Sequence, residues 1–251
     1  MKIILNNPTK AIFKRELKNY FHTPIGYVFL IIFLFAQGYI TFEPGKGSFF
    51  LLRQADLRPF FFTIPWMFIL FVPAISMRLW AEERRSGTIE LLLTLPVSVI
   101  DAVLGKFLAA WIFLIISLLL TFPMIITVFY LGSPDLVVII LGYIGASLVA
   151  GVMLSIGCFF SSLSKNQVIS FIFTSVFSYF MLMAGSPPVL EFLSSFLPTF
   201  FVELIENLSI MNHYESMQLG VLRLSDLLFF VFMILGWLLA TFLMLQEKKT
   251  E

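Results

Sequence analysis

The chain has 251 residues, of which 59% are hydrophobic and only 12% are charged, and its mean hydropathy is +0.98. A soluble domain carries about 25% charged residues, so this composition predicts an all-helical protein that crosses a membrane several times. The net charge of +1 gives no electrostatic basis for nucleic-acid binding, and a single cysteine, Cys158, excludes an internal disulfide and a cysteine-based metal site.

Residues 1–24 are predicted to form a cytoplasmic amphipathic helix on the membrane surface. Its lysines recur at every fourth residue and its apolar residues share another face: Lys10, Lys14 and Lys18 against Phe13, Leu17, Tyr20 and Phe21. Such a helix is attracted to an anionic cytoplasmic leaflet. A cleaved signal peptide is the alternative, but the basic region is too long and no small-residue cleavage site follows, so we expect an uncleaved first span.

Residues 25–251 are predicted to form one transmembrane domain of six helices. Each apolar run is close to the roughly 20 residues that a helix needs to cross a bilayer. The runs are Ile25 to Phe42, Phe60 to Met77, Ala102 to Leu131, Leu136 to Leu163, Val168 to Ala184 and Leu227 to Leu245. Pro65 and Pro73 in the second run and Pro123 in the third are expected to bend their helices.

The fourth run carries a stripe of small residues, which are Gly142, Ala146 and Ala150 with Ser147, Gly151 and Ser155 beside them. Small side chains let another helix approach closely. The stripe therefore predicts tight packing, either within the chain or at a subunit interface.

The distribution of lysine and arginine predicts that both termini face the cytoplasm. With the N-terminus inside, twelve of the sixteen basic residues lie on the cytoplasmic side and only Lys46, Arg53, Arg58 and Arg223 lie outside. This bias fixes the orientation of most multi-pass proteins. Two short helices, at residues 189–196 and 199–208 within an outer segment at 187–225, follow Pro188 and Pro198 and should lie near the outer leaflet.

The segment at 78–98 concentrates charge between two apolar runs. Glu82, Glu83, Arg84 and Arg85 cannot lie in hydrocarbon and are therefore expected in water at the cytoplasmic face. Gly87 follows as a flexible position, and Thr88 can cap a short apolar helix that contains Glu90, Leu91 and Leu92 and ends at Pro96. Ser98 and Asp101 form a capping box that starts the third span. The leucines fit either a groove on a partner protein or the lipid headgroups.

The run from Trp80 to Ser98 resembles the signature between the second and third spans of ABC-2 type permeases, the membrane subunits of ATP-binding-cassette transporters. The stretches from Phe13 to Tyr27 and from Asn212 to Gly220 are similar to the gliding-motility and nitrous-oxide-reductase-maturation permeases of that family. The resemblance implies an ABC-2 (type V exporter-like) fold in the bacterial inner membrane, and short outer helices that cap the transport path.

The resemblance also implies that the segment at 78–98 is a coupling helix that docks on an ATPase subunit. The coupling residues would then be Glu82, Glu83, Arg84, Arg85, Gly87, Thr88, Glu90, Leu91, Leu92 and Pro96. Reversing the charge at Glu83 should weaken docking without affecting folding. The implied partners are an ABC ATPase dimer, a second permease copy or a related membrane subunit, and a companion with a large extracytoplasmic domain.

No catalytic or metal site is predicted in the chain. His22 and His213 fall on opposite sides of the membrane, and the Gly-Lys-Gly-Ser sequence at 45–48 lacks the spacing of a phosphate-binding loop. The central parts of the six runs hold no ionisable residue, which disfavours an ion-driven carrier. We therefore expect a transport subunit that is not an enzyme, with ATP and Mg²⁺ bound by a separate ATPase. The alternative is a membrane anchor for an ATPase-driven mechanical or assembly machine, and the substrate is not specified.

Overall fold

The computed structural model describes residues 8–42, 55–87 and 98–250, and these ranges contain helices and connecting segments but no strand. The helices are α1 (Pro8–His22), α2 (Pro24–Phe42), α3 (Arg58–Ser76), α4 (Ala81–Ser86), α6 (Val99–Leu119), α7 (Pro123–Leu131), α8 (Leu136–Leu163), α9 (Gln167–Met183), α10 (Pro187–Ser194), α11 (Thr199–Asn207), α12 (Ile210–Gln218) and α13 (Leu224–Thr250). The predicted all-helical class is confirmed for this part of the chain.

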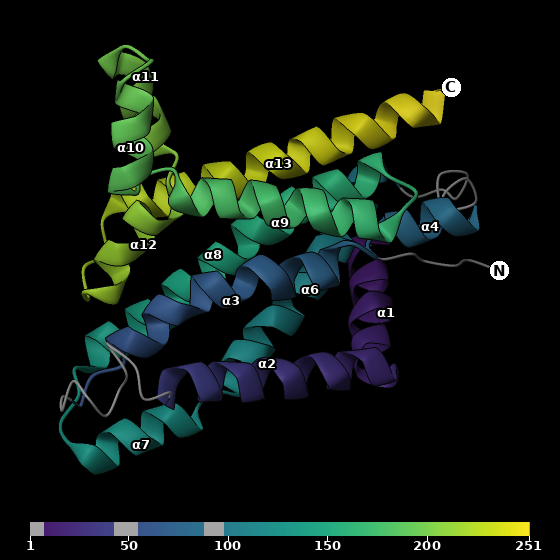
Figure 1. Cartoon of the computed structure of the whole chain (residues 1–251). Coiled ribbons are helices and arrows are strands. Elements are labelled where there is room, and N and C mark those ends of the chain that lie inside the picture. Colours follow the sequence, from purple (N-terminus) through teal and green to yellow (C-terminus); the bar gives the residue numbers. More distant parts are fainter. Residues whose placement is uncertain (1–7, 43–54, 88–97, 251) are drawn as a thin grey trace.

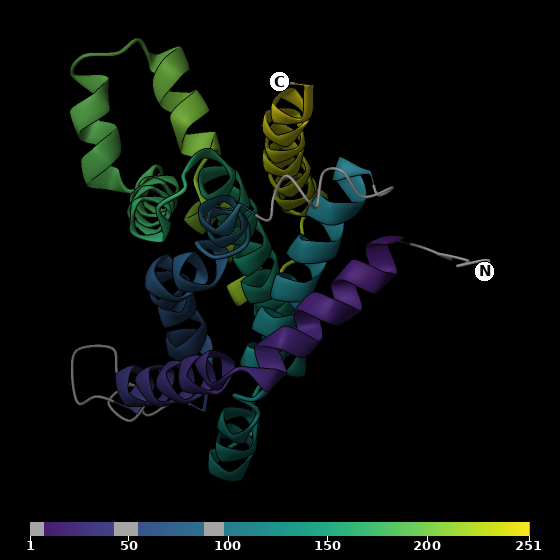
Figure 2. The ribbon, with the colours of Figure 1, turned by 90° about the vertical axis from the view of Figure 1, so that its right-hand side faces the viewer.

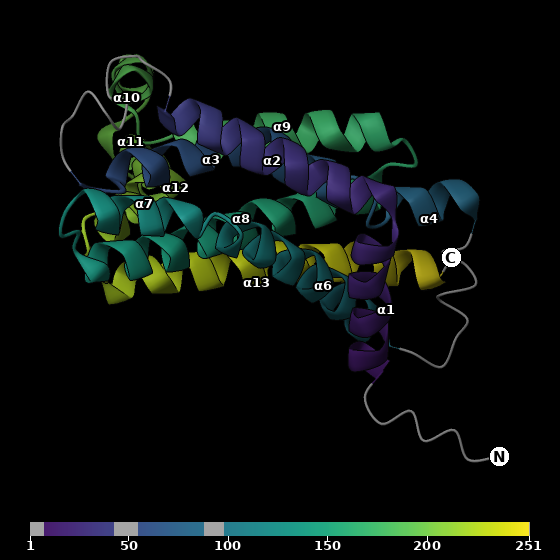
Figure 3. The ribbon, with the colours of Figure 1, turned by 90° about the horizontal axis from the view of Figure 1, so that it is seen from below.

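The long helices form two layers with α8 at the centre. Figures 2 and 3 show α2, α3 and α9 along one side of the molecule and α6, α8 and α13 along the other. Helix α8 contacts α3, α6, α9, α12 and α13. In its most apolar stretch 56% of the residues are buried, against 28% in α2 and 22% in α13. The apolar surfaces of α2 and α13 therefore face outward, as expected for helices in lipid.

Glycine lets α8 and α3 approach each other closely. A Cβ atom added at Gly142 would lie 2.4 Å from Cε2 of Phe61, and one added at Gly157 would lie 2.1 Å from Oγ of Ser76. Both distances are shorter than any real contact allows, so only glycine fits at these positions. Ala146 and Ala150 of the same stripe are fully buried. The small-residue stripe thus serves packing within the chain.

Several stretches are long and apolar enough to cross a membrane. Among the described residues they are Pro24–Phe42, Arg58–Ser86, Val99–Leu131, Leu136–Leu163 and Leu224–Glu247. Helix α9, the predicted fifth span, passes the same test only together with α10, from which it is bent by 85°. The multi-pass architecture is confirmed, whereas the number of six spans stays a prediction.

The third predicted span consists of two helices rather than one bent helix. Helix α6 ends at Leu119, and Pro123 is the first residue of α7. Proline has no N–H to donate, and its fixed φ matches the first position of a helix. A helix that begins at Pro123, after the end of α6, is therefore favourable. Helix α3 continues through Pro65 and Pro73. Proline position alone therefore does not determine whether these helices break.

Helices α10, α11 and α12 lie at the end of the bundle opposite α1 (Figure 1). The first two correspond to the predicted short helices, but α12 is not predicted by the sequence analysis. It begins after Ser209, which caps it, and buries Ile210, Tyr214 and Met217 completely. The Tyr214 hydroxyl donates to the carbonyl of Phe61 at 3.2 Å. The spacing of these three residues by four and three was the available signal for a helix.

Helix α1 runs across the ends of the long helices (Figure 1) and packs on α6. The ring of Tyr20 stacks on Phe113 with centroids 4.8 Å apart, and Phe21 meets the same ring at 5.6 Å. The apolar face that was expected to rest on lipid is therefore covered in part by α6. The lysines of the opposite face, Lys10, Lys14 and Lys18, are exposed. The position of α1 on a membrane surface stays a prediction.

Replacing Gly157 by alanine should destabilise the bundle, because the new methyl group meets Ser76 at the contact between α8 and α3. Overpacking of this kind costs about 1 to 3 kcal/mol. We expect a lower midpoint of thermal unfolding for purified Gly157→Ala in detergent. Gly38→Ala is the matched control, since nothing lies within 4 Å of a Cβ atom at that position. An unchanged midpoint for Gly157→Ala would contradict the close packing.

Candidate functional site

Helix α4 opens the charged segment, and a serine of α8 fixes its first residues. The Oγ atom of Ser161 accepts hydrogen bonds from the backbone N–H groups of Trp80 (3.0 Å) and Ala81 (3.1 Å). The same hydroxyl donates to the carbonyl of Met77 at 3.1 Å. One buried side chain therefore satisfies three polar groups of the turn between α3 and α4. The start of α4 cannot move without moving the end of α8.

Arg84 makes a second connection between α4 and α8. Its Nη1 atom donates to the carbonyl of Ser162, close to the C-terminus of α8. The last carbonyls of a helix lack partners within the helix and carry partial negative charge, so a guanidinium is well placed there. Helix α4 then ends at Gly87, which has φ +73°. Glycine adopts this left-handed conformation without the steric cost that other residues pay.

Lys106 joins three helices at one point. Its Nζ atom lies 2.7 Å from Oε1 of Glu83 in α4 and 3.3 Å from Oε1 of Glu16 in α1. It also lies 5.4 Å from the centre of a ring of Trp80, within reach of a cation–π interaction. The lysine side chain is only 4% exposed. A buried ammonium is tolerated because two carboxylates compensate its charge.

The charge of Lys106 in turn affects the pKa of Glu16. Burial alone would raise the pKa of Glu16, but the charges of Lys106 and Arg15 and their hydrogen bonds outweigh burial and hold this pKa below its ordinary value of 4.5. Glu16 therefore stays ionised at neutral pH. Helices α1 and α6 are held together further by the Thr9 hydroxyl, which donates to Oδ1 of Asp101. The Ser98 cap predicted for α6 is present, since its Oγ accepts from the backbone N–H of Asp101 at 3.2 Å.

The predicted coupling residues divide into three groups. Glu82, Arg85 and Gly87 are exposed. Glu83 and Arg84 contact Lys106 and Ser162 within the chain, which the sequence analysis did not foresee. The remaining predicted residues, Thr88, Glu90, Leu91, Leu92 and Pro96, lie outside the described residues. Reversing the charge at Glu83 would place two cations together, so it would disturb the subunit itself as well as any docking.

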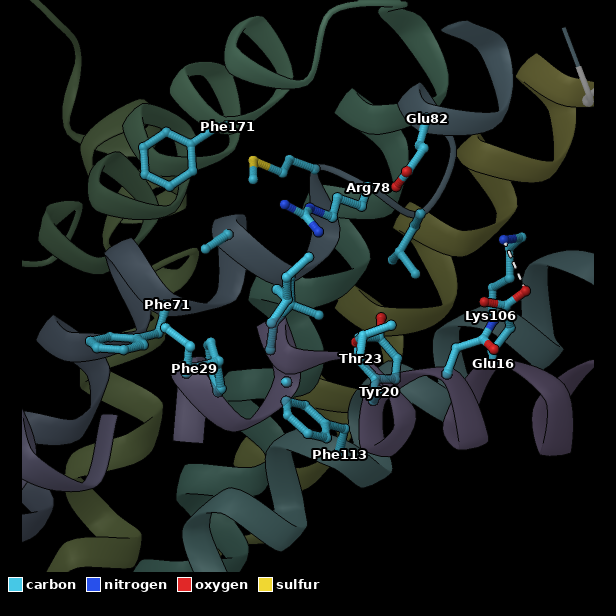
Figure 4. A pocket seen from close by; sticks show the side chains of 18 of the residues that line it. Glu16, Tyr20, Thr23, Phe29, Phe71, Arg78, Glu82, Lys106, Phe113 and Phe171 are labelled. Atoms are coloured by element: carbon cyan, nitrogen blue, oxygen red, sulfur yellow. Dashed lines mark hydrogen bonds and ion pairs between the residues drawn. The ribbon is translucent and has the colours of Figure 1, made fainter. Parts of the chain in front are cut away.

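A large cavity lies beside the ion-paired cluster (Figure 4). Its volume is about 1180 Å³, and it is lined by residues of α1, α2, α3, α4, α6 and α9 and of the turn before α4. Charged side chains, among them Glu16, Arg78 and Glu82, lie on one side, and the rings of Phe29, Phe71 and Phe113 lie on the other. The cavity is therefore amphipathic.

The described residues bring together no three histidine, cysteine or acidic residues that could hold a metal ion. The ion pairs among Glu16, Glu83 and Lys106 form a network of contacts between helices at this end of the bundle. Together with the hydrogen bond from Arg84 to α8, it connects an exposed helix, α4, to the ends of α1, α6 and α8.

A family model described as "ABC-2 family transporter protein" matches residues 10–247. The chain belongs to the ABC-2 transporter family. The match covers all the described helices apart from the first two residues of α1 and the last three of α13. Members of this family are membrane subunits that work with an ABC ATPase. A comparison with curated proteins gave no significant match. This ABC-2 chain is a multi-pass membrane protein, and its family supports a transport subunit.

Lys106→Met should destabilise this ABC-2 subunit, because Glu16 and Glu83 would each lose the buried ammonium with which they pair. Breaking a buried ion pair in this way costs about 3 to 5 kcal/mol. We expect less folded protein in size-exclusion profiles and a lower midpoint of thermal unfolding. Lys14→Met, an exposed lysine of α1, is the control.

A charge swap sharpens this test. Glu83→Lys alone should be as damaging as Lys106→Met, whereas Glu83→Lys combined with Lys106→Glu should recover part of the loss. If the double variant is no more stable than the single ones, the pairing of these two side chains is not what stabilises the site.

Proposed function

We propose that this chain is the permease subunit of an ATP-binding-cassette transporter that moves or extrudes a substrate with ATP hydrolysed by a separate ATPase. The observation that supports this is the attachment of α4: its residues Glu82 and Arg85 are exposed, while Glu83 and Arg84 hold it to α6, α1 and α8. A force applied to α4 would reach those three helices directly. Contact of the ATPase with α4 and with the segment that follows it is part of the proposal.

Energy supply from a partner also fits the distribution of charge. The described spans carry Asp, Glu, Lys, Arg or His only near their ends, at positions such as Arg58, Lys106 and Asp226. An ion-coupled carrier needs an ionisable or polar coordination site near the membrane midplane. An ATPase that binds outside the membrane needs none.

The proposed orientation places α1, α4 and the C-terminal end of α13 in or at the cytoplasm and α10 to α12 outside. These elements do lie at opposite ends of the bundle (Figure 1), and the charge bias of twelve basic residues against four sets the direction. In this orientation α1 would lie at the cytoplasmic membrane surface, with exposed lysines toward water and headgroups. We further propose a six-span count, with α9 as the fifth span.

The proposed assembly contains two permease subunits and two ATPases. The outward-facing apolar residues of α9, including Ile172, Phe173 and Val176, offer a surface for the second subunit or for lipid. The similarity of two stretches to gliding-motility and nitrous-oxide-reductase-maturation permeases suggests that subgroup and a companion with an extracytoplasmic domain. The same similarity supports a second candidate function, in which the chain anchors an ATPase-driven mechanical or assembly machine and no solute is transported.

The docking proposal is tested at the exposed residues of α4. Glu82→Lys combined with Arg85→Glu should reduce the ATPase recovered with the affinity-purified permease on the order of tenfold or more, because charges at the contact lose their partners. The ATPase is identified by mass spectrometry, and permease amounts in the membrane are matched. Glu206→Lys, exposed on α11 at the other end, is the control. If the amount of recovered ATPase is unchanged, α4 does not dock on the ATPase, and a position at the lipid surface is favoured instead.

The orientation is tested by labelling with a membrane-impermeant thiol reagent. A cysteine at Glu206 should react in intact cells, whereas one at Arg85 should react only after the membrane is permeabilised. Cys158 is 1% exposed and should give no background. Reaction at Arg85 in intact cells would reverse the orientation and exclude a cytoplasmic ATPase at α4.

A further inference from the structure

The cavity beside the ion-paired cluster is lined by a cation that has no counterion among the described residues. Arg78, in the turn between α3 and α4, lines this cavity. Its Nε atom is buried without a hydrogen-bond partner, and its guanidinium makes no hydrogen bond or ion pair within residues 8–42, 55–87 and 98–247. Figure 4 shows Arg78 among the side chains that line the cavity, on the same side as Glu82. A buried N–H group without an acceptor is costly, and a ligand that supplies acceptors at Arg78 would remove this cost.

Among the described residues, the acidic side chains in the same wall form no ion pair with Arg78. Glu16 is paired with Arg15 at 2.6 Å and with Lys106, and Glu83 is paired with Lys106 at 2.7 Å. Glu82, which also lines the cavity, is exposed and forms no ion pair with another described residue, so water screens its charge. The half-buried guanidinium of Arg78 is therefore the cationic group available to a ligand. A guanidinium presents paired donors that suit a phosphate group.

The opposite wall is apolar and continues onto the outer surface of the bundle. Phe29, Phe71 and Phe113 line the inner part. Ile32 of α2 and Leu70 of α3 line the outer part and are 53% and 55% exposed. Their exposed sides face the region where lipid surrounds the spans. The cavity is thus open to the bilayer along α2 and α3, and an occupant can extend from Arg78 into that region.

These features fit a molecule with an anionic head and long hydrocarbon chains. The volume of about 1180 Å³ exceeds the roughly 300 to 1,000 Å³ of typical small-molecule sites. A water-soluble phosphate would leave the apolar wall uncovered, and an uncharged lipid would leave Arg78 without a partner. In the proposed orientation the cavity lies at the level of the cytoplasmic headgroups, where acidic phospholipids supply a phosphate without the cationic group of zwitterionic lipids.

We propose that this cavity binds one acidic phospholipid of the cytoplasmic leaflet, with its phosphate at Arg78 and its acyl chains along α2 and α3. The level of the site in the membrane rests on the proposed orientation. Binding itself requires no ATPase. The lipid would fill the angle between α1 and α2 and contact the turn that leads into α4.

The test uses Phe71→Trp as a fluorescent reporter in the cavity, with the wild-type signal subtracted. The protein is reconstituted in phosphatidylcholine vesicles that contain a small fraction of chain-brominated lipid, since bromine quenches indole fluorescence on contact. Brominated phosphatidylglycerol should quench the introduced indole several-fold more strongly than the same fraction of brominated phosphatidylcholine. Adding Arg78→Gln should abolish this preference, and Arg78→Lys should retain most of it.

Lys14→Gln is the matched control, because Lys14 is an exposed lysine of α1 that does not line the cavity. Equal quenching by both lipids, or equal loss of the preference in Lys14→Gln and Arg78→Gln, would overturn the proposal. Competition by soluble glycerol 3-phosphate would also overturn it, since the ligand would then be a free phosphate. The fluorescence measurement needs no ATPase. Lipid binding in the cavity and ATPase docking on α4 can therefore be disproved independently of each other.

Discussion

One buried ammonium group organises the end of the bundle that carries α1 and α4. Lys106 is almost inaccessible to water, and an isolated charge in that environment is prohibitively costly. The fold can keep it only if carboxylates approach it, and these come from two different helices. The positions of α1, α4 and α6 are therefore interdependent. A displacement of any one of them exposes or separates charges, which makes partial displacements unfavourable.

A second constraint acts through shape rather than charge. Helix α8 touches at least six other helices, and its glycines leave no free space against Phe61 and Ser76 of α3. Densely packed interiors transmit displacement because they cannot be compressed. Ser161 and Arg84 extend this packed unit to α4 by hydrogen bonds. The contacts that hold α4 thus lead directly into the most buried helix of the subunit.

Sequence reasoning predicted the features that depend on composition and local pattern. Long apolar runs, the Ser98 cap and the two short helices after Pro188 and Pro198 follow from such patterns, and all have counterparts in the structure. The pairing of Lys106 with Glu16 and Glu83 was not predictable, because the partners are 90 and 23 residues away. Nothing local distinguishes Glu83 from its exposed neighbour Glu82. The break before Pro123 was not predictable from the presence of proline alone, since α3 continues through Pro65 and Pro73.

The sharp angle between α1 and α2 has a consequence for how this subunit can change shape. A Cβ atom at Gly26 would lie 1.9 Å from the carbonyl oxygen of Tyr20, so the two helices meet without any intervening side chain. Thr23 is the single residue between them. Helix α2 also packs on α3, where the rings of Phe33 and Phe71 meet with centroids 5.3 Å apart. Any change in the angle between α1 and α2 must therefore be taken up by the backbone around Thr23 and must also disturb the contact between α2 and α3.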